Sequence, residues 1–81
     1  MNVTVRFYSY FKDITGCEEL VESIPAGATL GQLHEQVAAR FPKLQAMRNS
    51  TLTAVGVDYQ TRDHILQDGD EVALFPPVQG G

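Results

Sequence analysis

Apolar and polar residues alternate along residues 2–11 of the chain. Every second position in the first half of this stretch carries a large apolar side chain, namely Val3, Val5 and Phe7. A period of two residues is typical of a β-strand with one buried and one exposed face. Residues 18–24 alternate less clearly, and the turn-forming residues 25–27 follow them. The two stretches predict an antiparallel hairpin whose connection lies at residues 12–16.

The hydrophobic period changes to that of a helix after Thr29. Apolar residues then recur at steps of three and four, namely Leu30, Leu33, Val37 and Phe41. Thr29 is a suitable N-cap, and Gln32 stands at the spacing of a capping box. Because Pro42 cannot continue a helix, the pattern predicts one main helix over about residues 29–41.

The last third of the chain predicts short strands separated by turns. Residues 52–57 are β-rich and uncharged, which predicts a strand more buried than the others. Residues 58–62 have the composition of a turn, and residues 64–66 are a candidate short strand. Asp68 and Gly69 favour another turn before the last strand, residues 71–75.

The resulting order β-β-α-β-(β)-β predicts an α+β fold. A right-handed crossover places the last strand parallel to the first, in the middle of the sheet. This is the ubiquitin-like β-grasp arrangement, a mixed four- to five-stranded sheet with one main helix across one face. The predicted core comprises Val3, Val5, Phe7, Leu33, Val37, Phe41, Val55, Val72 and Leu74. We expect the β-grasp domain to span residues 1–75, with residues 76–81 as an extended arm.

Composition narrows the class of function. The chain has 81 residues, enough for one domain with one modest core. Its net charge of −4 argues against nucleic-acid binding, which requires a basic patch. No apolar run approaches the ~20 residues that cross a bilayer, so we expect no contact with a membrane. The single cysteine, Cys17, excludes an internal disulfide and suits a reducing cytoplasm, the expected location.

Few side chains offer chemistry of their own. Cys17 stands beside Glu18 and Glu19, whose charges oppose formation of a reactive thiolate. A metal site needs three or four ligands, so the isolated His34 and His64 predict surface histidines and no metal. Five acids in the C-terminal third leave two interpretations open, an acidic docking face or a solvated turn region. These acids are Asp58, Asp63, Asp68, Asp70 and Glu71.

Three aromatic residues fall outside the predicted core. Tyr8 and Phe75 have the opposite parity to the core residues of their strands. If the first and last strands are neighbours, both rings lie on the open face of the sheet, and Tyr59 can join them from the turn. Because clustered exposed aromatic side chains are typical of interfaces, we predict that these three residues contact a partner protein.

The chain closes with the stretch PPVQGG. Pro76 and Pro77 have no N–H to donate, so they end the sheet ladder and start an extended arm. At about 3.1 Å per residue this arm reaches roughly 18 Å. Gly80 and Gly81 have no side chains, so the tip fits a narrow channel in a partner. The Gly81 carboxylate would react only after activation, for example as an acyl-adenylate. The arm comprises Pro76, Pro77, Val78, Gln79, Gly80 and Gly81.

With this tail the chain resembles, over essentially its full length, the small sulfur-carrying subunits of molybdopterin synthase. These are the MoaD-type carriers of the ubiquitin-like β-grasp superfamily. The motifs that carry the resemblance are the corner at residues 12–16, the pair Ala54-Val55, the turn at residues 68–72 and the close at residues 75–81. Gly56 departs from the pattern, since many relatives have a polar residue such as Asn there. This departure leaves the partner face around Tyr59 less defined than the tail.

The resemblance implies a mechanism and a set of partners. A ubiquitin-activating-like adenylyltransferase would use ATP to adenylate Gly81, and a sulfur donor protein would convert it to a thiocarboxylate. Inside the large synthase subunit, Gly81 would give its sulfur to cyclic pyranopterin monophosphate to form the dithiolene of molybdopterin. Two small and two large subunits would form a heterotetramer. The chain would hold no permanent cofactor and would not be catalytic alone.

Three other functions are compatible with the pattern. One is a sulfur carrier of the same fold that serves thiazole or cysteine synthesis. Another is a ubiquitin-like modifier whose Gly81 is joined to lysines of target proteins. The third is a β-grasp interaction module with an inert tail. The Phe75-Pro76-Pro77 close favours the molybdopterin carrier among them.

Overall fold

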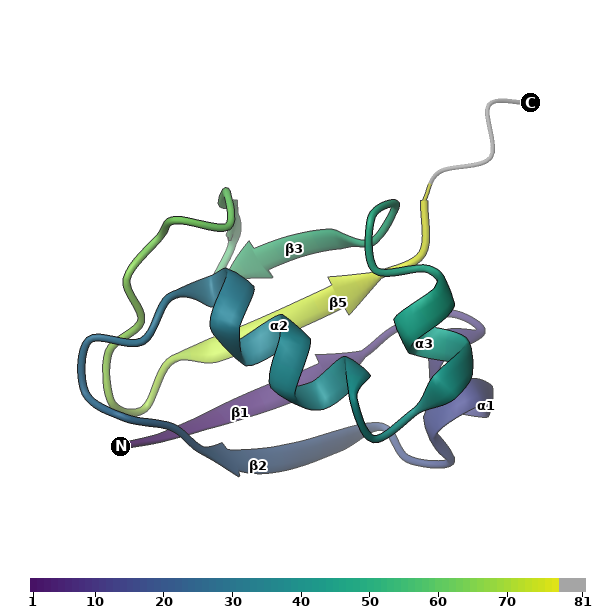
Figure 1. Ribbon diagram of the computed structural model, residues 1–81, viewed down its shortest axis with the longest axis horizontal. Coiled ribbons are helices and arrows are strands. Elements are labelled where there is room, and N and C mark those ends of the chain that lie inside the picture. The colour runs from purple at the N-terminus through teal and green to yellow at the C-terminus, as the bar shows by residue number, and fades with distance from the viewer. Residues whose placement is uncertain (78–81) are drawn as a thin grey trace.

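The computed structural model describes residues 1–77, in which five strands form one mixed sheet (Figure 1). The strands are β1 (Asn2–Phe7), β2 (Glu19–Ser23), β3 (Leu52–Val55), β4 (Asp58–Tyr59) and β5 (Glu71–Phe75). Three helices, α1 (Phe11–Thr15), α2 (Leu30–Ala38) and α3 (Pro42–Ala46), complete this part of the chain. Figure 1 shows α2 lying across one face of the sheet, with α1 and α3 together near the end where β5 finishes.

The strand order is β2-β1-β5-β3-β4, so the last strand occupies the centre of the sheet. β1 pairs with β2 antiparallel and with β5 parallel, where Val5 lies opposite Val72. β3 is antiparallel to both β5 and β4. This topology confirms the predicted β-grasp fold, including the crossover that brings the two terminal strands together.

The core fills the space between α2 and the covered face of the sheet. Most of the predicted core residues are buried, namely Val3, Val5, Phe7, Leu33, Val37, Val72 and Leu74. Phe41 and Val55 pack against this core but remain partly exposed. Phe11 of α1, Leu44 of α3 and Leu66, which lies in the loop before β5, are also fully enclosed. The apolar residues that alternate along β1 therefore mark the covered face of the sheet.

The start of α2 is held by a capping box and by a neighbouring loop. The Thr29 hydroxyl accepts from the Gln32 N–H at 3.2 Å, and the Gln32 side chain accepts from the Thr29 N–H at 2.8 Å. The next two N–H groups, of Leu30 and Gly31, donate to the carbonyls of His64 and Arg62. A Cβ on Gly31 would lie 3.1 Å from Arg62, so glycine permits this close approach. The loop thus satisfies the free donors of the first helical turn.

The main helix ends at Ala38, earlier than predicted. Phe41 has an extended backbone (φ −130°) and serves as the N-cap of α3, whose first residue is Pro42. Pro42 therefore starts a short helix as well as stopping a long one. The first connection is also helical, because α1 occupies residues that the pattern assigned to a loop, and Gly16 (φ 75°) closes α1.

Two strand predictions in the C-terminal third are wrong. Residues 64–66 form no strand and make a single bridge from Ile65 to Thr29, while the fourth strand is β4, in the expected turn. Gly56 (φ 62°) opens the two-residue loop that pairs β4 with β3. β3 is also less buried than predicted, because only Ala54 is buried there whereas β5 buries three consecutive residues.

The blurred alternation of β2 has a structural cause. Glu22 points to the covered side and is buried, where it forms an ion pair with Arg40 after the end of α2. Val21 points to the opposite side and is 66% exposed. An acid replaces the expected apolar residue at this edge position because a guanidinium is near enough to compensate its charge.

Candidate functional site

The end of the central strand brings two aromatic rings together on the open face of the sheet, the face opposite α2. Phe7 lies opposite Leu74 in the parallel ladder, and the Tyr8 N–H donates to the Leu74 carbonyl at 3.2 Å. The next side chains, Tyr8 and Phe75, therefore lie side by side. Their ring centroids are 4.7 Å apart and the rings are inclined by 17°, a stacked pair.

Tyr59 adds a third ring to this pair. The hairpin of β3 and β4 places Tyr59 opposite Ala54, and its ring centroid lies 6.2 Å from that of Phe75. Tyr59 is 70% exposed, and Tyr8 and Phe75 are each partly exposed. We call Tyr8, Tyr59 and Phe75 the aromatic cluster. The structure thus brings together the three rings that the sequence suggested as a group.

The aromatic cluster lies directly before the predicted arm. Pro76 and Pro77 follow Phe75 without belonging to a strand, and both are partly exposed. Figure 1 shows the chain continuing past the end of β5 at these prolines. Val78, Gln79, Gly80 and Gly81 lie outside the described residues. A protein that binds the cluster would therefore meet the chain where it leaves the sheet.

The acids of the C-terminal third mostly serve local structure. The carboxylates of Asp68 and Asp70 accept from the backbone N–H groups of Asn2 and Gln67, each at 2.8 Å. Asp63 accepts from the Thr61 hydroxyl, and this hydrogen bond lowers the pKa of the Asp63 carboxyl. These contacts favour the interpretation as a turn region over a shared acidic face.

His34 is buried, so its prediction as a surface histidine is wrong. Its side chain is 2% exposed, because the loop that carries Arg62 packs on α2. The His34 Nδ1 lies 3.5 Å from the Arg62 Nη1, which can only donate, so Nδ1 is the acceptor and Nε2 carries the hydrogen. Burial, and then the Arg62 guanidinium, lower the pKa of His34. Both causes disfavour the charged form of the ring.

Residues 1–77 contain no second candidate site such as a reactive thiol or a metal centre. Cys17 is partly buried and packs against the core. Among these residues no group of three or more His, Cys, Asp or Glu side chains is arranged to hold a metal ion. No helix in this part of the chain is long and apolar enough to cross a membrane. The aromatic cluster and the adjoining prolines are therefore the candidate site.

Comparison with known proteins places the chain in a family. The model of the ThiS family matches residues 5–81, which is nearly the whole chain. The chain belongs to the ThiS family. The matched residues include the aromatic cluster, the two prolines and the terminal glycines.

Individual relatives of this ThiS-family chain align with it over nearly the full length of both proteins. The human molybdopterin synthase sulfur carrier subunit is 34% identical, with 98% of this chain and 93% of the human protein covered. The solved structure assigned to molybdopterin converting factor subunit 1 of Pyrococcus furiosus is 29% identical, with a TM-score of 0.87 and 96% and 99% of the two chains covered. A complex of subunits 1 and 2 of molybdopterin-converting factor from Helicobacter pylori contains a chain that is 26% identical, with a TM-score of 0.71 and full coverage of both chains.

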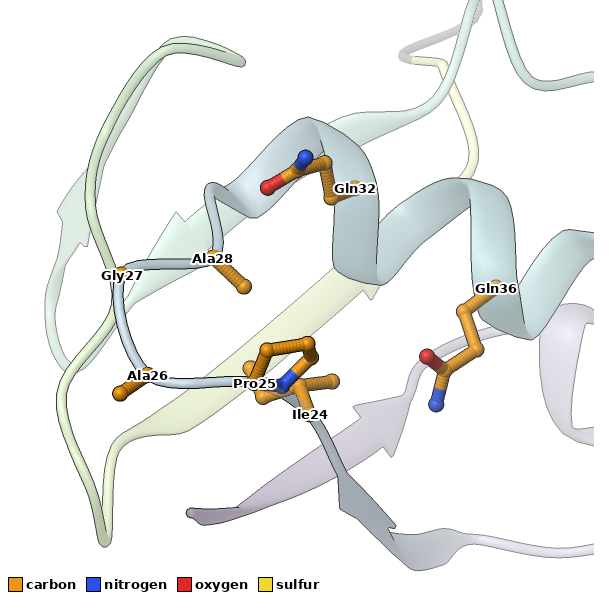
Figure 2. Close-up of a pocket in the computed structure, with 7 residues that line it drawn as sticks. All are labelled: Ile24, Pro25, Ala26, Gly27, Ala28, Gln32 and Gln36. Atoms are coloured by element: carbon orange, nitrogen blue, oxygen red, sulfur yellow. The ribbon is translucent and has the colours of Figure 1, made fainter.

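A surface hollow of about 380 Å³ lies at the other end of the sheet (Figure 2). It lies between the loop after β2 and the first turns of α2, where Gln32 and Gln36 project. Its remaining lining is made of small apolar residues, namely Ile24, Pro25, Ala26, Gly27 and Ala28. None of the lining side chains titrates, and the hollow is near the start of β1, away from the tail. It adds nothing to the site at the end of β5.

Proposed function

We propose that this chain is the sulfur carrier subunit of molybdopterin synthase. The observation that carries the proposal is the aromatic cluster at the end of β5, immediately before Pro76, in a ThiS-family chain. The human relative bears the name of this subunit and aligns with almost the whole chain. The cluster gives a partner a place to bind, and the residues after it supply the reacting terminus.

The proposed chemistry begins with activation of Gly81. A ubiquitin-activating-like adenylyltransferase brings ATP, and a carboxylate oxygen of Gly81 attacks the α-phosphate and expels pyrophosphate. Sulfur at the oxidation level of sulfide, delivered by a donor protein, then attacks the acyl carbon. AMP leaves with the oxygen, and a thiocarboxylate remains. ATP is therefore a substrate of the activating enzyme, and the carrier needs no permanent cofactor.

Sulfur transfer takes place in the large synthase subunit. The arm of Pro76, Pro77, Val78, Gln79, Gly80 and Gly81 enters its active site, where two glycines without side chains fit a narrow channel. The thiocarboxylate sulfur replaces an oxygen substituent on a carbon of cyclic pyranopterin monophosphate: a carbon–sulfur bond forms, the carbon–oxygen bond breaks, and the oxygen leaves in water or stays on the phosphate. Water then cleaves the bond between that sulfur and the acyl carbon, which restores the Gly81 carboxylate. Two such transfers supply the two sulfurs of the dithiolene.

Recognition of the large subunit is the task of the aromatic cluster. Aromatic side chains at the centre of an interface bury much apolar area while they lose little conformational entropy. The related chain of Helicobacter pylori is found in a complex with subunit 2 of its converting factor, which supports the same pairing here. We propose a heterotetramer of two small and two large subunits. Groups for acid–base catalysis would come from the large subunit, so the carrier is not an enzyme alone.

Reconstitution tests the carrier chemistry. The purified chain is incubated with its adenylyltransferase, ATP and a sulfur donor, and its intact mass is measured. We expect a gain equal to the difference between sulfur and oxygen, located at Gly81. A variant without Gly81 is the control, and it should keep the fold and gain nothing. An unchanged mass with an active adenylyltransferase would refute the proposal.

A second step separates the possible acceptors. The charged carrier is mixed with the large synthase subunit and cyclic pyranopterin monophosphate, and molybdopterin formation is followed. We expect product only when both proteins are present. Sulfur loading without molybdopterin would instead favour a carrier for thiazole or cysteine synthesis. Covalent attachment of Gly81 to lysines would favour a protein modifier.

A further inference from the structure

An ion-pair triad lies beside the aromatic cluster on the open face. Arg6 of β1 lies opposite Glu19 of β2 and next to Ala73 of β5 in the sheet. Its Nε is 2.9 Å from the Glu71 Oε1, and its Nη2 is 3.4 Å from the Glu19 Oε2. We call Arg6, Glu19 and Glu71 the ion-pair triad. One guanidinium thus bridges carboxylates from the strands on both sides of β1.

The strand geometry places this triad within reach of whatever covers the aromatic cluster. Tyr8, directly after β1, is two residues from Arg6, and Phe75 is two residues from Ala73 on β5, which is about 7 Å along an extended chain. Stable interfaces bury about 800 Å² on each partner, far more than three rings supply. A protein seated on the cluster therefore extends beyond it, and the adjoining triad lies within its reach.

The triad carries an unbalanced charge. Two carboxylates face one guanidinium, and all three side chains are about half exposed, at 46% for Arg6, 53% for Glu19 and 56% for Glu71. Water compensates the surplus negative charge in the free chain. A partner that removes this water must supply a positive group or lose free energy to an unpaired buried charge. Glu19 has the longer contact with Arg6, so it is the carboxylate more free to turn towards that group.

We propose that the ion-pair triad determines which large synthase subunit the open face accepts, by requiring a lysine or arginine of that subunit opposite Glu19. This inference rests on the proposed function and adds a specificity element to its docking face. The aromatic cluster supplies apolar contact that many partners could match. The triad fixes the orientation of the partner on the sheet and rejects a surface that places an acid there.

Binding kinetics of charge variants test the inference. Association of the chain with the large synthase subunit of the same organism is measured at low salt, about 0.05 M, and at high salt, about 0.5 M. We expect Glu19→Lys to slow association ~10-fold or more at low salt and Glu19→Gln to slow it less. At high salt the association rates of both variants should approach that of the unaltered chain. Asp63→Lys is the matched control, because it makes the same change in net charge on an exposed loop away from the open face.

The outcomes are distinct. A slower association of Glu19→Lys relative to Asp63→Lys, lost at high salt, supports the triad as a specificity element. Equal association rates for Glu19→Lys and Asp63→Lys at low salt overturn this inference and leave the proposed function standing. Failure of the unaltered chain to bind the large subunit overturns the proposed function and this inference together.

Discussion

The two faces of the sheet differ in what their side chains do. On the covered face, Val5, Phe7 and Val72 are fully enclosed beneath α2. On the open face, Tyr8 and Phe75 occupy equivalent positions on the same two strands and remain partly exposed. Burial against a helix makes the first set part of the core, whereas no helix within residues 1–77 covers the second set. One sheet therefore carries the core on one side and, on the other, the exposed aromatic cluster that we propose as the partner surface.

Phe7 and Tyr8 give the largest expected contrast, because they are neighbours on opposite faces. Phe7→Ala should lower the free energy of unfolding by about 3–5 kcal/mol, since it leaves a cavity in a small core. Tyr8→Ala removes one stacked ring contact and should cost only about 1 kcal/mol. Urea unfolding of both variants, followed by circular dichroism, measures the difference. Equal destabilisation by the two variants would mean that the open face also belongs to the core.

Substitution of Phe75 should affect partner binding, whereas substitution of Phe7 affects mainly stability. Its ring is at the centre of the aromatic cluster, so Phe75→Ala should weaken binding to the large synthase subunit by about 2 kcal/mol, or roughly 30-fold. Calorimetric titration measures this loss. Ile65→Ala is the control, because Ile65 is an exposed apolar residue outside the cluster and should leave affinity unchanged. Similar losses from both variants would indicate a general effect of apolar area.

The smallest expected effect is a change in the pH dependence of stability, and it comes from His34 on the covered side of the sheet. Its pKa is lowered in the fold, so the unfolded chain binds a proton at a higher pH than the folded chain does. The stability that a neutral His34 contributes is present above its ordinary pKa of about 6.5 and decreases as the pH falls below that value. His34→Gln should therefore show a shallower loss of unfolding free energy between about pH 7.5 and pH 5.5.

The comparison for His34 needs a second histidine variant. His64→Gln leaves the buried ring in place and should keep the pH dependence of the unaltered protein. Urea midpoints at several pH values give the slopes of all three proteins. If His34→Gln kept the full slope, the pH dependence would have to come from other groups.

The β-grasp topology was predictable because the strongest patterns coincide with its main elements. The alternation of β1, together with the parity of Val72 and Leu74 in β5, assigned both faces of the central pair, including the positions of Tyr8 and Phe75. The capping residues Thr29 and Gln32 marked the start of α2 correctly. Local sequence was sufficient here because the hydrophobic period of each element already indicates which of its side chains face the core.

Other features depend on contacts between distant segments. Glu22 could not be assigned to the covered face from its neighbours, because its partner Arg40 is 18 residues away. The sequence predicted His34 as a surface residue, because the loop that buries it, which carries Arg62, is 28 residues further along the chain. β4 has only two residues, too few for a period, and it forms because Gly56 allows the chain to fold back onto β3. For Glu22 and His34, a contact with a distant segment outweighed the local pattern, whereas β4 depends on a local turn at Gly56.

The central position of β5 has a consequence for biosynthesis. Tyr8 is translated early, but its ring gains the Phe75 neighbour only when β5 enters the sheet between β1 and β3. β5 is the last of the five strands to be made. A chain whose β5 has not yet entered the sheet therefore lacks the stacked pair of Tyr8 and Phe75, and with it the surface that we propose for the partner.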